Sequence, residues 1–212
     1  MNKELSFTDL PEKVQALFHA VVMLLGEGRN VQTLTVSEIT TKAGIGKGTA
    51  YEYFSNKEEI IASAICYEAI LFMQQLEQEM STERTFQESL LTCLHYMEAR
   101  KITTKTLGMY AHIIMVQSSL GDMIKEKMCM LEQYDLVTPK KLLVRYINIA
   151  KGKNEIRKDL PESYISAVIT MKFIFFIWAL TEDETIIKRE MDGATREDIC
   201  GYIIDGIMKE LC

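Results

Sequence analysis

The sequence predicts an all-α protein of about nine helices. Apolar residues recur at intervals of three and four along most of the chain, as they do on one face of a helix. Runs of β-branched residues are short, and no two of them are joined by an Asn-Gly or Asp-Gly hairpin turn. The 212 residues include 11 glycines and 3 prolines, and 48% are apolar. A chain of this length and composition buries a substantial core and is not disordered.

The first helix is predicted to begin near Asp9. The Asp9 carboxylate would cap it and Glu12 would complete a capping box, while the first turn tolerates Pro11. Apolar residues then follow at helical spacing. Gly26 and Gly28 are predicted to end this helix.

Two short helices are predicted next. Thr35, with Glu38 three residues later, forms a second capping box at the start of a helix over 36–43. Gly44 can take the left-handed conformation that closes this helix. The next helix is predicted over about residues 47–54.

The rest of the chain is also predicted to be helical. Ser55 would cap a longer fourth helix, about residues 57–80, which is apolar on two faces. Thr85 and Glu88 form a third capping box. The remaining predicted helices lie near 85–100, 104–117, 120–151 with a break at Pro139, 161–182 and 195–211.

Composition excludes several classes of protein. The formal net charge of −6 argues against non-specific coating of nucleic acid, but it leaves room for a local basic face. Residues 164–180 are apolar but fall short of the ~20 residues that span a bilayer, and Lys172 lies at their centre. We therefore expect a helix buried in protein and no membrane partner.

The cysteines and the N-terminus indicate a cytoplasmic protein. The five cysteines are odd in number and contain no Cys-x-x-Cys pair, so neither a disulfide framework nor a zinc site is expected. The N-terminal residues lack the apolar core of a signal peptide. The cysteines are Cys66, Cys93, Cys129, Cys200 and Cys212.

One segment carries most of the functional information: residues 35–60, TVSEITTKAGIGKGTAYEYFSNKEEI. Two short helices joined by a tight glycine turn predict a helix-turn-helix, whose second helix is sized to enter the major groove of DNA. Gly46 and Gly48 are poor helix formers, but they let backbone N–H groups approach a phosphate closely. A cation, a hydroxyl and two phenols suited to phosphates and base edges follow within seven residues: Lys47, Thr49, Tyr51 and Tyr53.

This segment resembles the DNA-binding domain of the TetR family of bacterial transcriptional regulators. That family's pattern is a T-[VI]-x-x-I-A helix, then A-G-V-S-x-G-[TS]-[LI]-Y-x-[YH]-F, then a K-[DE]-x-L helix start. The present chain has T-V-S-E-I-T, A-G-I-G-K-G-T-A-Y-E-Y-F and S-N-K-E-E-I in the same order and spacing. The resemblance is strong over about residues 8–62 and concerns architecture beyond them.

The resemblance implies two domains and a set of DNA contacts. Residues 1–56 would form the helix-turn-helix domain, and residues 57–212 a helical ligand-binding and dimerisation domain linked to it by the fourth helix. Phosphate contacts are expected from Thr35, Lys47, Thr49, Tyr51 and Lys57, and base contacts from Gly48, Thr49 and Tyr53. Packing on the first helix is the alternative role for Tyr51 and for Tyr53.

Three residues depart from the family's pattern. Thr40 replaces a small alanine and Ala50 replaces a larger aliphatic residue, so we expect the two to compensate across one helix–helix contact. Gly46 replaces a serine, which removes the hydroxyl that would cap the recognition helix.

The C-terminal helices predict a homodimer with a ligand pocket. The helix over 161–182 has two apolar stripes, of which a monomer covers one, so the other is expected to meet a partner. The predicted interface residues are Ile165, Ile169, Phe176, Ile199 and Ile203. Methionines, which suit adaptable apolar pockets, and aromatic residues suggest the pocket, with core packing as the alternative: Tyr96, Met109, Tyr110, Met130, Tyr134 and Trp178.

The predicted function is a ligand-responsive, DNA-binding transcriptional regulator. As a dimer it would repress from a palindromic operator of double-stranded DNA, and a small apolar effector in the C-terminal domain would release it. The alternative is a thiol-based redox regulator with the same helix-turn-helix, which would require an exposed, acidic thiol at Cys66, Cys93 or Cys129. No catalytic motif suggests an enzyme, and no cofactor or metal is expected.

Overall fold

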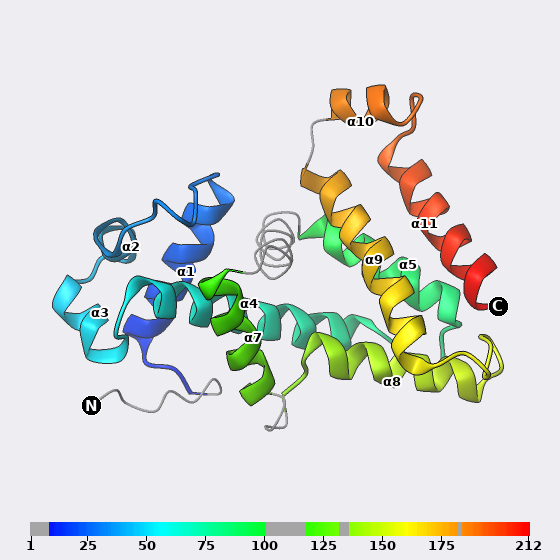
Figure 1. Cartoon of the computed structure of the whole chain (residues 1–212), viewed down its shortest axis with the longest axis horizontal. Coiled ribbons are helices and arrows are strands. Elements are labelled where there is room, and N and C mark those ends of the chain that lie inside the picture. The colour runs from blue at the N-terminus through cyan, green and yellow to red at the C-terminus, as the bar shows by residue number, and fades with distance from the viewer. Residues whose placement is uncertain (1–8, 101–117, 132–135, 182–183) are drawn as a thin grey trace. The chain divides into compact units, whose positions relative to one another are not determined.

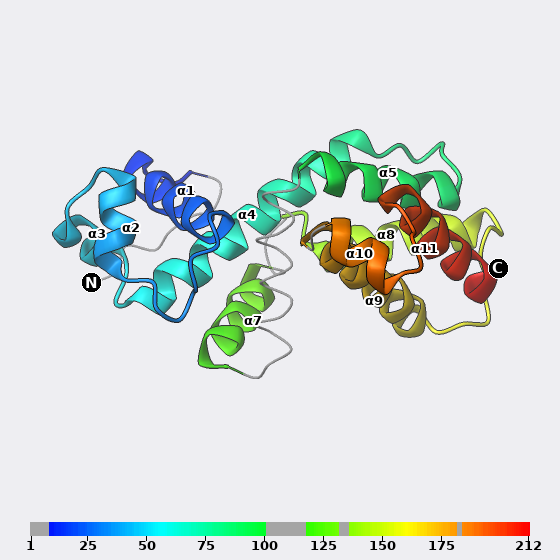
Figure 2. The same cartoon turned by 90° about the horizontal axis from the view of Figure 1, so that it is seen from above.

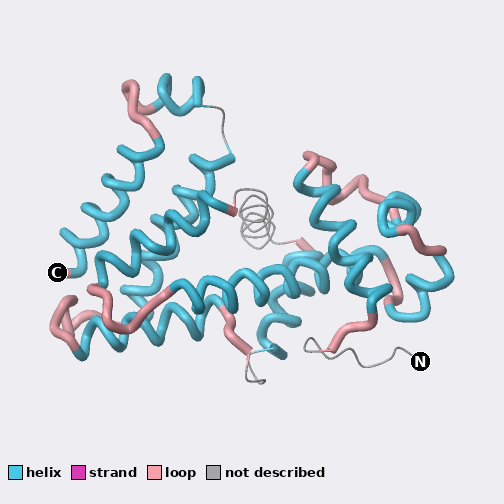
Figure 3. Tube along the Cα trace, turned by 180° about the vertical axis from the view of Figure 1, so that it is seen from behind, coloured by secondary structure: helices cyan, strands magenta, loops and turns pink. Residues whose placement is uncertain are grey.

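The structure is a computed structural model that describes residues 9–100, 118–131, 136–181 and 184–212 (Figures 1 and 3). These residues form helices and loops and contain no strand, which confirms the all-α prediction. The predicted helix over 104–117 lies outside the described residues. The helices are α1 (Glu12–Gly26), α2 (Val36–Ala43), α3 (Lys47–Tyr53), α4 (Lys57–Glu79), α5 (Phe86–Ala99), α7 (Ser119–Leu131), α8 (Pro139–Gly152), α9 (Glu162–Thr181), α10 (Glu184–Glu190) and α11 (Arg196–Leu211).

Capping chemistry sets most of the helix starts. The predicted capping boxes of Thr35 with Glu38 and of Thr85 with Glu88 are both present, at the starts of α2 and α5. A further capping box, which the sequence analysis did not use, begins α11 with Thr195. Helix α10 was not predicted either.

Two predicted caps are wrong. Helix α1 begins after Pro11, which occupies the N-cap position without a side-chain hydrogen bond, so Asp9 does not cap it. Pro11 itself has the extended ψ of 142°, so the helix begins after it. At the start of α4, the side chain of Asn56 rather than Ser55 accepts the N–H of Glu59, at 2.8 Å.

The described residues divide into two compact units, the first drawn from 9–71 and 118–136 and the second from 72–100 and 137–212. In the first unit, α2 and α3 pack beside α1 (Figure 2), and α4 and α7 add to the same core. The ring of Phe18 on α1 lies 5.7 Å from Phe54 and 5.5 Å from Tyr67 on α4, measured between centroids. This shared aromatic core supports the helices that carry the predicted DNA contacts.

The second unit is built around α9, which packs against α5, α8 and α11. The turn after α8 ties these helices together. Glu155 in that turn accepts the N–H of Phe86, the first residue of α5, and the N–H of Arg157 donates to the carbonyl of Leu211 at 2.7 Å. Lys153 Nζ donates to the carbonyls of Thr82 and Arg84, at 2.7 and 2.8 Å. The start of α5 and the end of α11 are thus both hydrogen-bonded to the turn after α8.

Two helices are long and apolar enough to cross a membrane by length and composition: α4, and α9 over residues 162–180. Core helices of soluble proteins pass the same test, and 61% of the α4 window is buried. The α9 window has a mean hydropathy of 1.8 and is 33% buried. Residues 164–180 are therefore helical as predicted, but most of their surface is not buried within the chain.

Candidate nucleic-acid interface

Helices α2 and α3 form a helix-turn-helix whose turn is made by Gly44. This residue has φ = +70°, a left-handed conformation that glycine adopts without steric cost. The next residue, Ile45, donates its N–H to the carbonyl of Thr40 at 3.0 Å and closes α2. Ile45 and Ala43 pack on the core of the unit, and Ile39 is fully buried in it.

Helix α3 buries one side and exposes a mixed polar face on the other. Ala50 is fully buried, and Phe54, directly after the helix, is 1% exposed. Lys47 and Gly48 are exposed, Tyr51 is 52% exposed, and Thr49 is partly exposed. These predicted DNA-contacting residues of α3 are therefore accessible to solvent.

Lys47 is the accessible cation of α3. Within the described part of the chain, no carboxylate lies within 4 Å of its ammonium group, whereas Arg29, Lys42 and Lys57 each have a carboxylate partner. An unpaired ammonium is available to a phosphate without first breaking an ion pair. Gly46 caps α3 without a side-chain hydrogen bond, which confirms the expected consequence of its missing hydroxyl.

Two roles were considered for Tyr53, a base contact and packing on the core. Its ring is partly buried against the core, 6.5 Å from the ring of Phe54. Packing thus accounts for part of this side chain, and a base contact remains a prediction.

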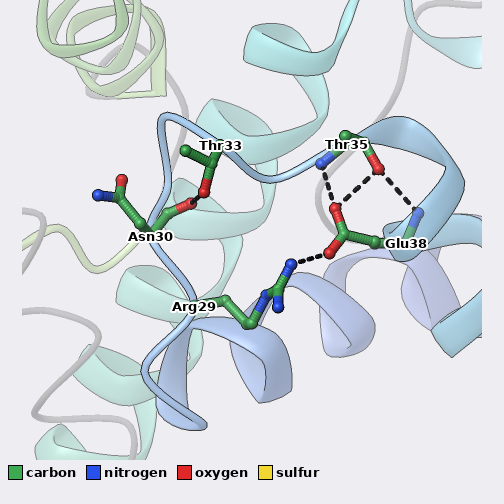
Figure 4. Close-up of polar contacts among 5 residues, drawn as sticks. All are labelled: Arg29, Asn30, Thr33, Thr35 and Glu38. Atoms are coloured by element: carbon green, nitrogen blue, oxygen red, sulfur yellow. Dashed lines mark hydrogen bonds and ion pairs between the residues drawn. The ribbon is translucent and has the colours of Figure 1, made fainter.

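Two other predicted contact residues have intrachain partners. Thr35 donates from its N–H and its hydroxyl to Glu38 Oε2, at 2.9 and 2.8 Å (Figure 4). Lys57 Nζ donates to the carbonyl of Gln32 at 2.9 Å. A phosphate at either residue would compete with these bonds. The hydrogen bonds from Thr35, together with the charge of Arg29, hold the pKa of Glu38 below its usual value, because they stabilise the ionised carboxylate.

The substituted residues Thr40 and Ala50 are both buried, on helices that contact each other. The Thr40 hydroxyl donates to the carbonyl of Ser37 at 3.2 Å. The added polar group is therefore satisfied within α2. This arrangement agrees with the expected compensation, which remains a prediction.

Comparison with known proteins identifies the family. The family described as "Bacterial regulatory proteins, tetR family" matches residues 23–64, which span the helix-turn-helix. The fatty acid degradation regulator FadR from Bacillus halodurans has the same fold, with a TM-score of 0.68 over 94% of this chain and 96% of that one at 18% identity. Over residues 23–64 the chain matches the DNA-binding segment of the TetR family. That family is one of regulatory proteins, in agreement with the prediction of a regulator and not an enzyme.

Further proteins are similar to this chain in fold or in part of their sequence. FadR from Bacillus subtilis, solved in complex with stearoyl-CoA, gives a TM-score of 0.66 at 18% identity, over 92% of this chain and 97% of that one. The HTH-type transcriptional regulator YxbF of Bacillus subtilis is 27% identical over 173 residues, or 77% of this chain. The fatty acid metabolism regulator protein of the same organism is 32% identical over 78 residues, or 37% of this chain. The matches span 44% and 40% of the length of these two curated relatives.

The predicted ligand residues of this chain do not form one described site. Met109, Tyr110 and Tyr134 lie outside the described residues. Tyr96 is buried in the second unit, where its hydroxyl donates to Gln75 Oε1 at 3.1 Å. Met130 belongs to the first unit and is exposed. A pocket involving these residues remains a prediction.

The predicted dimer-interface residues require correction. All five are at most 2% exposed within the single chain, so they belong to its own core: Ile165, Ile169, Phe176, Ile199 and Ile203. The sequence showed two apolar stripes on α9 but not which one α5, α8 and α11 cover. They cover the stripe assigned to the partner. Residues of the other stripe remain exposed, at Tyr164, Met171, Phe175 and Trp178, and Tyr202 on α11 is also exposed.

The buried cysteines are poorly suited to thiol-based redox regulation. Cys66 and Cys93 are buried, and burial raises the pKa of each thiol to about 12. Burial likewise raises the pKa of Cys200 to about 11. Cys129, the third candidate for a redox role, is exposed. The described residues contain no group of three or more His, Cys, Asp or Glu side chains that could hold a metal ion.

Proposed function

We propose that this chain is a DNA-binding transcriptional regulator that contacts its operator through the exposed face of α3. The observation that supports this most directly is the arrangement of that helix. It rests on a buried alanine and a buried phenylalanine, while Lys47, Thr49 and Tyr51 face outward with an ammonium group unpaired within the described residues. The TetR-family match over the same segment supports the same role.

The regulator is proposed to act as a homodimer on a palindromic operator. A C2 dimer holds its two recognition helices about one helical turn of DNA apart, ~34–36 Å. The exposed stripe of α9 supports this proposal, because Met171 is 56% and Trp178 is 37% exposed on a helix of high mean hydropathy. A second copy is the occupant that this stripe fits, since isologous contacts bury the same apolar patch from both sides.

The effector is proposed to be a small apolar molecule that binds the cytoplasmic protein and releases it from DNA. Stearoyl-CoA, whose acyl chain is apolar although its CoA part is charged, is the first probe to use, because FadR from Bacillus subtilis was solved in complex with it. An effector shifts the DNA-binding equilibrium only by its differential affinity for the two states. Repression relieved by such a molecule is the mode we propose.

The experiment that tests the DNA-binding proposal is fluorescence anisotropy of the purified protein. It compares DNA from upstream of its own gene with a scrambled duplex, over a series of salt concentrations. We expect affinity for the native DNA to be at least ~10³ tighter and to fall as salt rises. The variant Lys47→Ala, Tyr51→Ala should abolish this preference. Lys125→Ala on α7 removes an exposed cation outside the helix-turn-helix and should retain it.

Two results would count against the proposal. If genome-wide selection of bound fragments also recovers no preferred sequence, the chain does not recognise an operator. If Lys125→Ala loses the preference for native DNA as fully as the Lys47→Ala, Tyr51→Ala variant does, the loss reflects the lower positive charge of the protein and not contacts made by α3. Once a preferred DNA is found, addition of stearoyl-CoA to the same assay tests the effector proposal separately.

A further inference from the structure

The loop between α1 and α2 is a well-ordered turn whose charged side chains reach both ends of α2. The N–H groups of Gly28 and Arg29 each donate at 3.0 Å, to the carbonyls of Leu25 and Leu24. This pattern is a Schellman turn, and Gly28 supplies its left-handed residue with φ = +84°. The turn places Glu27 and Arg29 on either side of Gly28.

These two loop residues form ion pairs with opposite ends of α2. Lys42 Nζ lies 2.7 Å from Glu27 Oε1, and Arg29 pairs with the carboxylate of Glu38 (Figure 4). Glu38 and Lys42 are four residues apart, the spacing and order that favour a direct pair along a helix. Instead of pairing with each other, each forms an ion pair with a residue of the loop. We call Glu27, Arg29, Glu38 and Lys42 the α1–α2 brace.

The loop that carries the brace is bonded internally and to α4. The Asn30 side chain accepts the N–H of Gln32 at 2.8 Å, and the Asn30 carbonyl accepts the N–H of Leu34 at 3.0 Å. Leu34 is 1% exposed and anchors the end of the loop in the core. Lys57 adds a bond from α4 to the carbonyl of Gln32 at 2.9 Å. These hydrogen bonds restrain the α1–α2 loop, so the loop can in turn restrain α2.

Packing holds one face of α2. Of its eight residues, Ile39 and Thr40 are buried, and Val36 and Ala43 are partly buried against the core. Exposed ion pairs add little to folding stability, but a pair at each end of a short helix opposes its rotation and tilt. Because α2 contacts α3 directly, its orientation bears on how α3 is presented to DNA.

We propose that the α1–α2 brace fixes the orientation of α2 for DNA recognition, which makes Glu27 and Arg29 positioning residues outside the helix-turn-helix. This inference rests on the proposed DNA-binding function. It assigns to two loop side chains a contribution to operator affinity that does not require them to touch DNA.

The test exchanges the charges of Glu27 and Lys42, because Glu38 also caps α2 and its replacement would confound the result. Glu27→Lys places two ammonium groups together and adds positive charge to the protein. Charge alone would tighten DNA binding. The brace instead predicts weaker operator binding, on the order of tenfold, because like charges now repel. Lys42→Glu should weaken binding as well, and the double exchange should restore it to within about threefold.

Anisotropy on the preferred DNA measures these affinities, and far-ultraviolet circular dichroism checks that each variant is folded. Lys125→Glu on α7 reports the effect of charge alone. Should Glu27→Lys fail to fold, Glu27→Gln removes the pair without repulsion and should lower affinity about two- to threefold. The ratio of wild-type to Glu27→Gln affinity should approach one at high salt, where exposed pairs are screened.

The outcomes separate this inference from the proposed function. A wild-type protein without any preferred DNA overturns the proposed function itself. A wild-type protein that binds its operator, with Glu27→Lys binding equally or more tightly, overturns the brace alone. A double exchange as weak as the single variants also overturns it, because pairing would then not be what is lost.

Discussion

At the scale of single residues, burial decides which thiols are available. Cys66 is fully buried on α4 and Cys93 is 8% exposed on α5, and neither environment favours a thiolate. A thiol-based switch requires the thiolate form, since that is the species that reacts with an oxidant. The two buried candidates for the redox alternative are therefore poor nucleophiles.

We expect native-state alkylation at pH 8 to modify the exposed Cys129 and to spare Cys66 and Cys93. Mass spectrometry of peptides after timed iodoacetamide treatment measures this. Because burial raises the pKa of Cys66 and Cys93 to about 12, folding stability should decrease as pH rises from about 9 toward 12. The unfolded thiols release their protons in this range while the folded ones retain theirs. Rapid labelling of Cys66 in folded protein would contradict the assignment.

At the scale of secondary-structure elements, helix ends follow local chemistry. The capping boxes join residues three apart, so the sequence alone predicted those at Thr35 and Thr85. The bond from Lys57 to Gln32 joins residues 25 apart and has no local signature, so its intrachain role was missed. The choice between two caps one residue apart, Ser55 and Asn56, depended on backbone geometry that composition does not specify.

The capping carboxylate of α5 should make stability dependent on pH. The backbone and side-chain hydrogen bonds of Thr85 lower the pKa of Glu88 below its usual value. A lowered carboxylate pKa adds stability above the unfolded pKa, about 4.3, and this contribution is lost as pH falls through the folded pKa. Glu88→Gln should therefore destabilise the protein at pH 7 and have a smaller effect below pH 4. Urea unfolding at both pH values measures the difference, and equal effects would refute it.

Two glycines of the helix-turn-helix should respond oppositely to alanine. Gly44 has φ = +70°, so Gly44→Ala should cost about 1–2 kcal/mol of stability. Gly48 is helical, and a Cβ there would meet no atom within 4 Å, so Gly48→Ala should stabilise by about 0.4–1 kcal/mol. If the backbone of Gly48 approaches DNA, the same change should weaken operator binding. Thermal unfolding with anisotropy separates the two effects, and a stabilising Gly44→Ala would contradict the turn geometry.

At the scale of the whole molecule, α9 shows where sequence analysis reached its limit. Its periodicity revealed two apolar stripes, and the structure contains both. Which stripe is covered depends on how α5, α8 and α11 pack together on α9, and the spacing of residues within α9 does not specify this. The interface residues were thus assigned to the stripe that the chain itself buries, although the expectation of an uncovered stripe was sound.

Substitutions at two adjacent residues of α9 should affect association and folding separately. Phe175 is exposed and Phe176 is fully buried. Phe175→Asp should produce a folded monomer, because it places a charge in the proposed interface. Phe176→Ala should cost about 3–5 kcal/mol of stability, because it leaves a cavity in the core of the second unit. Sedimentation velocity and urea unfolding measure the two outcomes. A dimer that survives Phe175→Asp would place the interface elsewhere.

The stacked pair on the exposed stripe gives the protein an internal optical reporter. Trp178 is the single tryptophan of the chain, and its ring lies 5.6 Å from that of Phe175. Indole emission shifts to shorter wavelength when water is excluded. The emission maximum of the unlabelled protein should therefore move to shorter wavelength as the protein is concentrated and dimerises. A dilution series read by intrinsic fluorescence would give the dissociation constant of the dimer without a dye or tag. The same signal would follow subunit exchange in real time.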